Sequence, residues 1–110
     1  MGMDLPKLRK LLALDPADPL SRFALGKKLF EENTPESLAE AAEHLIFANA
    51  NAPGHLATYH ILAQTLIRLN QKDEARPVLQ EGIRRVKQVG EGMGRDLGPA
   101  MEAMLNQING

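Results

Sequence analysis

Residues 89–100, VGEGMGRDLGPA, hold four glycines and one arginine in twelve positions, residue types that can bind phosphate. A phosphate-binding loop needs glycine backbone at the start of a helix that follows a strand, and a lysine that reaches the phosphates. The residues before this stretch, IRRVKQV, have helical spacing, and neither G-x4-G-K-S/T nor G-x-G-x2-G between a strand and a helix is present. We therefore interpret the stretch as a joint between two helices, where Gly90, Gly92 and Gly94 follow the first helix and Asp96 caps the second.

The histidines and hydroxyl residues do not form a recognisable catalytic or metal-binding pattern. His55 and His60 are five residues apart, which on a helix separates them by about 140° and does not suit two ligands of one metal ion. His44 is the third histidine, no carboxylate pair completes a metal-ligand set with His55 and His60, cysteine is absent, and Ser21 and Ser37 are the only serines. The sequence thus predicts a protein without a metal, a cofactor or catalytic residues, and so not an enzyme.

Length and charge restrict the classes of partner. The chain has 110 residues, with 13 lysines and arginines against 14 aspartates and glutamates. Neither half is basic enough to bind a nucleic-acid backbone by bulk charge, so no nucleic-acid partner is expected. Apolar runs are short, the N-terminus MGMDLPKLRK lacks the apolar core of a signal peptide, and cysteine is absent. We expect no membrane segment and a cytoplasmic location.

Apolar residues recur at helical spacing along almost the whole chain, and no segment alternates with the period of two that a half-buried strand needs. This pattern predicts an all-α protein of about six short helices. Asp18 before Pro19 and Thr34 before Pro35 are predicted N-caps. The other prolines fall between the apolar stripes or within the first turn of one. Pro77 would lie at the edge of a first turn, and we expect its helix to begin at 73–76. The apolar stripes lie at 5–12, 20–30, 38–46, 56–67, 75–86 and 97–108.

A repeat of about 34 residues is present twice, and it resembles the tetratricopeptide repeat (TPR). The resemblance covers residues 5 to 88, and the small residues Gly26, Ala41, Ala63 and Ala75 stand where two helices approach closely. The TPR tryptophan position holds Arg22, and Lys87 stands in place of the second closing proline. The first unit reads Arg22-x2-Leu25-Gly26-x2-Leu29, Ala41-x3-Leu45 and Pro53, and the second reads Tyr59-x2-Leu62-Ala63-x2-Leu66 and Ala75-x3-Leu79.

The resemblance implies a right-handed α-solenoid of antiparallel helix hairpins in one domain over residues 1–110. The expected parts are an N-terminal cap helix at 5–14, repeat 1 at 19–53, repeat 2 at 56–88 and a C-terminal cap helix at 97–108. Caps are needed because the terminal repeats of a solenoid have neighbours on one side only. Deletion of residues 97–110 is expected to unfold or aggregate the protein.

In TPR proteins the first helix of each hairpin lines a concave groove, and the resemblance therefore implies a groove that binds a partner's peptide or helix. The expected function is a non-catalytic protein–protein adaptor, and the alternative is a structural homo-oligomer, including a weak homodimer, that assembles through the groove or a cap helix. Phe23 and Phe30 are either anchors of this groove or core beneath the N-terminal helix. The implied groove residues are Leu20, Phe23, Lys27, Phe30 and Glu31 in the first unit, and Ala57, His60, Gln64, Ile67 and Arg68 in the second.

Overall fold

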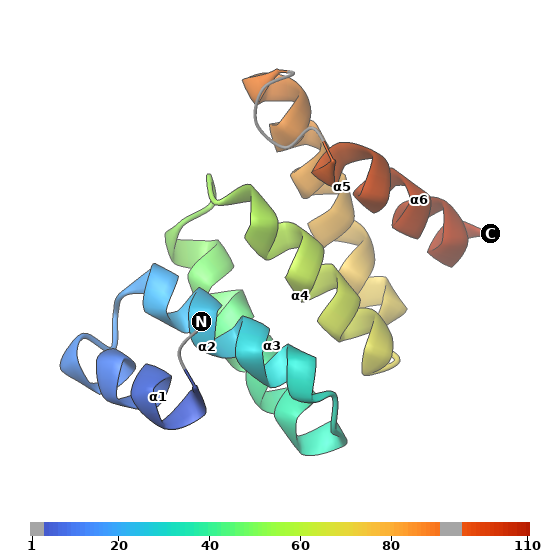
Figure 1. Cartoon of the computed structure of the whole chain (residues 1–110). Helices are drawn as coiled ribbons and strands as arrows, with labels where there is room; N and C mark the ends of the chain where they lie inside the picture. The colour runs from blue at the N-terminus through green and yellow to red at the C-terminus, as the bar shows by residue number, and fades with distance from the viewer. Residues whose placement is uncertain (1–3, 91–95) are drawn as a thin grey trace. The chain divides into compact units, whose positions relative to one another are not determined.

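The computed structural model describes residues 4–90 and 96–110, and within these ranges it contains six α-helices and no strand. The prediction of an all-α protein is confirmed (Figure 1). The helices are α1 (Leu5–Leu14), α2 (Pro19–Glu32), α3 (Pro35–Asn51), α4 (Leu56–Arg68), α5 (Lys72–Val89) and α6 (Leu97–Asn109).

The helices form two compact units, Met1–Pro53 and Gly54–Gly110. In the first unit, α2 and α3 run antiparallel as a hairpin, and α1 packs against α2 (Figure 1). Leu25, Leu29 and Leu45 form its buried centre. Gly26 makes close helix packing possible, since a Cβ atom at this position would lie 2.7 Å from Leu45 Cγ.

In the second unit, α4 and α5 form an antiparallel hairpin, and α6 packs against both helices. The buried core consists of Tyr59, Ala63, Leu79 and Met101. Gly82 lies against this core, because a Cβ at Gly82 would be 2.8 Å from both Met101 Sδ and Tyr59 Cβ. Around the core pack the partly buried residues Val78, Ile83, Val86, Leu97, Met104, Leu105 and Ile108.

Two of the three predicted helix caps are confirmed. The Asp18 side chain accepts a 3.2 Å hydrogen bond from Leu20 N at the start of α2. At the start of α3, Thr34 Oγ1 accepts from Ser37 N at 3.0 Å, and Ser37 Oγ accepts from Thr34 N at 2.9 Å, which forms a capping box. Asp96 stands at the N-cap position of α6, but its side chain makes no capping hydrogen bond.

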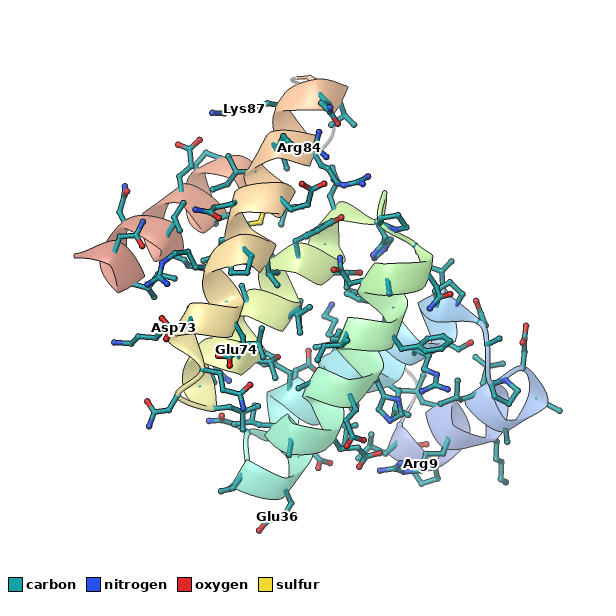
Figure 2. All side chains as sticks on the ribbon, turned by 180° about the vertical axis from the view of Figure 1, so that it is seen from behind. Arg9, Glu36, Asp73, Glu74, Arg84 and Lys87 are labelled. Carbon is teal, nitrogen blue, oxygen red and sulfur yellow. The ribbon has the colours of Figure 1, made fainter. Side chains whose placement is uncertain are left out.

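The helix that contains Pro77 begins one residue earlier than expected. α5 starts at Lys72 and continues through Pro77 to Val89. Charges at its ends complement the helix dipole, with Asp73 and Glu74 in the first turn and Lys87 in the last (Figure 2). These end charges and the buried residues of α5 are consistent with a helix that tolerates an interior proline.

The glycine-rich stretch is described only at its two ends. α5 ends at Val89, and Gly90 follows with a φ of 82°, a backbone conformation that glycine adopts without strain. Gly98 lies in the first turn of α6, and its Cα faces α5, where a Cβ would lie 3.3 Å from Val86 Cγ1. Gly92 and Gly94 fall outside the described residues. None of the helices in the described ranges has the length and apolar character needed to cross a lipid bilayer.

Candidate partner-binding surfaces

The first unit carries the five predicted groove residues of α2, and they differ widely in exposure. Leu20 is 55% exposed, and Lys27 and Glu31 are also exposed. Phe23 is half-buried, whereas Phe30 is only 9% exposed and is part of the hydrophobic core. Of the five predicted residues, Leu20 and Phe23 are therefore the apolar side chains that retain exposed surface for a partner, whereas Phe30 belongs to the buried core.

The second unit brings three of its five predicted groove residues together around one cavity. Gln64, Ile67 and Arg68 of α4 line a cavity of about 200 Å³. Met104 and Gln107 of α6 complete its wall. Ile67 and Met104 give this cavity an apolar surface, and the two glutamine amides give it hydrogen-bond donors and acceptors.

Ala57 and His60 lie on α4 as half-buried residues and are not part of this cavity wall. Burial lowers the pKa of the His60 imidazole from its ordinary value of 6.5, because charging the ring within the protein is unfavourable. His60 is therefore neutral at pH 7. It offers a partner one donor and one acceptor rather than a positive charge.

Met104 and Gln107 were missed as site residues by the sequence reasoning. Met104 belongs to the apolar stripe of the last helix, which the repeat pattern assigns to a cap, and so it was expected to serve only in packing. The two residues are three apart, a spacing that puts them on the same face of a helix. That spacing does not show whether the shared face lines a cavity, because this depends on how α6 packs against α4.

The basic residues near the end of α5 are largely offset by acids. Glu81 forms ion pairs with Arg84 and with Arg85, the latter at 2.7 Å. The two guanidinium groups lower the pKa of Glu81 to about 2, so the carboxylate stays charged at any ordinary pH. Lys87 Nζ lies 4.0 Å from Glu102 Oε1 of α6. This part of the surface therefore carries a smaller net positive charge than the sequence RRVK suggests.

A histidine–hydroxyl pair and the acidic and histidine side chains of the described residues are of the types that catalytic and metal sites use. The hydroxyl of Thr58 lies 2.7 Å from His55 Nδ1, but Thr58 is only 1% exposed, so a substrate cannot reach it. In the same ranges, no group of three or more histidine, aspartate or glutamate side chains is placed to hold a metal ion. Comparison of the chain with models of protein families, with curated proteins and with solved structures gave no match.

Proposed function

We propose that the protein is a non-catalytic protein–protein interaction module that binds a peptide or helix of a partner protein. The observation that carries this proposal is the cavity lined by Gln64, Ile67, Arg68, Met104 and Gln107. Its volume of about 200 Å³ is below the roughly 300–1,000 Å³ of pockets that enclose small-molecule ligands. It matches instead a single anchoring side chain of a larger partner, whose remaining contacts lie on the surrounding surface.

The chemistry of the cavity wall supports a peptide ligand. Ile67 and Met104 would contact an apolar side chain, and the thioether of Met104 can adapt to different shapes. The amides of Gln64 and Gln107 can each donate and accept, as the N–H and C=O groups of a peptide require. Arg68, an exposed residue of the wall, would favour an acidic side chain beside the anchor.

We also propose that the two hairpins are TPR-like repeats that stack as a right-handed solenoid. Support comes from the four small residues of the repeat pattern, Gly26, Ala41, Ala63 and Ala75, all of which are buried. In such a solenoid, Leu20, Phe23 and Lys27 of α2 would extend the binding surface.

A selection with displayed peptides tests the proposal. A library of random peptides on phage is selected against the full chain, and the affinity of the selected peptides is measured by fluorescence anisotropy. The variant Gln64→Glu with Gln107→Glu places negative charge in the cavity wall, and we expect it to weaken binding by roughly tenfold or more.

The matched control is Gln80→Glu with Gln88→Glu, which makes the same change of charge at exposed positions of α5. This control should bind like the wild type. Equal binding by both double variants would contradict the assigned surface. A selection that yields no peptide would contradict the peptide-binding function itself.

Self-association through α1 is the second candidate, and exposed leucines favour it. Leu14 is 83% exposed and Leu11 is 40% exposed, although both are large apolar residues on a helix. A homo-oligomer would cover them. Light scattering over a range of concentrations tests this candidate: a size that grows with concentration in the wild type, and not in Leu14→Glu, would favour it over the adaptor.

A further inference from the structure

A second cavity lies wholly within the first unit and shares no lining residue with the cavity of α4 and α6. Its volume is about 320 Å³, which reaches the range of small-ligand pockets. α1, the turn that follows it, α2 and α3 all contribute to the wall. Most of this wall is apolar and consists of Leu12, Ala13, Pro16 and Leu25.

Arg22 of α2 lines this cavity in a fixed position. Its Nε donates a 2.9 Å hydrogen bond to the carbonyl oxygen of Pro16. Its guanidinium carbon lies 4.1 Å from the centre of the Phe47 ring, a cation–π contact. These two contacts fix the orientation of the planar guanidinium group. Neither contact uses its two Nη groups, which can therefore donate to another acceptor.

Arg22 forms no ion pair within the described part of the first unit, although acids are close in sequence. The Asp18 carboxylate is occupied by Leu20 N and by the hydroxyl of Ser21, which donates at 2.6 Å. Glu40 is occupied by Arg9. A guanidinium that is held in place but not neutralised is a binding group for an anion.

The other cation at the cavity, Arg9, is already neutralised. Arg9 and Glu40 form a bidentate pair with N–O distances of 2.6 and 3.0 Å. The Arg9 guanidinium lowers the pKa of Glu40 to about 2, which keeps the carboxylate charged. His44, also in the cavity wall, lies with Nε2 3.2 Å from Glu40 Oε2. One positive charge, that of Arg22, therefore remains for a ligand.

We propose that this cavity binds a carboxylate that carries a short apolar tail. The two Nη groups of Arg22 would form a bidentate pair with the carboxylate, and the tail would lie against Leu12, Ala13 and Leu25. A single uncompensated charge matches a monovalent carboxylate better than a phosphate dianion. The carboxylate belongs either to a free acid or to the C-terminus of a peptide that ends in an apolar residue.

Nuclear magnetic resonance titration of the full chain tests this site. The probes are 4-methylpentanoate, its neutral amide, and a short peptide that ends in leucine as the free acid or as the C-terminal amide. We expect the acids, and not the amides, to shift the Arg22 Nε–H resonance and the backbone resonances of Ala13 and Leu25. Saturation by 4-methylpentanoate would show that a free acid suffices, and saturation by the peptide acid alone would assign the site to a C-terminus.

Two variants separate the charge from the shape of the cavity. Arg22→Gln should weaken binding by roughly tenfold or more, since it removes the charge-assisted pair. Ala13→Phe should block the cavity while Arg22 stays in place. Arg84→Gln, a loss of the same charge in the other unit, should bind the acids like the wild type. Circular dichroism confirms that each variant is folded.

Three results would overturn the proposal. They are equal shifts with the acids and the amides, unchanged affinity in both Arg22→Gln and Ala13→Phe, and no shift with any acid up to its limit of solubility. None of them depends on the cavity between α4 and α6, so this proposal and the adaptor function can fail separately.

Discussion

Two glycines permit close contacts in the helix hairpins, and Gly82 gives the sharper test. A Cβ at this position would lie 2.8 Å from Met101 Sδ and from Tyr59 Cβ, closer than real Cβ contacts. Gly82→Ala gains up to about 1 kcal/mol of helix propensity. Overpacking costs about 1–3 kcal/mol, so we expect a net loss of stability of roughly 1 kcal/mol in urea denaturation.

The matched control for Gly82 is Gly54→Ala, where a Cβ would meet no atom within 4 Å. Its stability should stay within about 0.5 kcal/mol of the wild type. A Gly82→Ala variant as stable as the wild type would show that the core of the second unit is looser than described.

His60 predicts a pH dependence of stability. Because burial lowers its pKa in the folded chain, the unfolded chain binds more protons once the pH falls below 6.5. The contribution of the neutral His60 ring to the free energy of unfolding is therefore complete above pH 6.5. It is lost as the pH falls through the lower pKa of the folded chain. We expect the melting temperature of the wild type to fall more than that of His60→Gln between about pH 7.5 and about pH 5.5. Parallel curves for the two proteins would contradict the burial of this ring.

The sequence predicted the helices well because the signals that form them are local. Asp18 and Thr34 stand directly before prolines at helix starts, and the structure shows both as caps. The cap at Asp4, which accepts from Lys7 N at 3.1 Å, was missed although it follows the same rule before Leu5 and Pro6. Asp96 has the right type and position, yet its backbone is helical and its side chain makes no capping hydrogen bond.

Pro77 shows how tertiary contacts override a local signal. It is the sixth residue of α5 and has no N–H to donate to the carbonyl oxygen of Asp73. Ala75 and Leu79 on the same helix are both fully buried, so packing of this face holds the helix together around the proline. This contribution depends on residues distant in sequence and could not be read from the spacing near Pro77.

Replacing this exposed proline is expected to stabilise the protein. Pro77→Ala restores a helical hydrogen bond and should raise the free energy of unfolding by about 1–3 kcal/mol, the upper limit being the interior cost of proline. Thermal and urea denaturation would measure the gain. A loss of stability would mean that the first turns of α5 need the fixed backbone of proline.

At the scale of the whole molecule, α6 supplies both core and surface. Met101 is fully buried between α4 and α5, and Met104 and Gln107 line the candidate cavity. The apolar stripe at 97–108 predicted the first role from its spacing. The second role depends on which side of α6 meets α4, and no local pattern specifies that packing.

Removal of α6 should therefore destroy the second unit. We expect deletion of residues 97–110 to cause loss of helix by circular dichroism and aggregation by light scattering, because it exposes the core of Tyr59, Ala63 and Leu79. The milder variant Met101→Ala should cost about 2–5 kcal/mol. Glu102→Ala, at an exposed position of the same helix, is the control and should change stability little. An unchanged melting curve after deletion would show that α6 is not part of the core.

The central claim is that the surface of α4 and α6 contacts a partner protein, and photo-crosslinking in the native cell tests it most directly. A photoreactive amino acid is placed at Gln107 in one variant and at Gln80, an exposed position on α5, in the other. We predict a crosslinked partner from position 107 and none from position 80. Equal crosslinking from both positions, or products that contain only this chain, would contradict the claim.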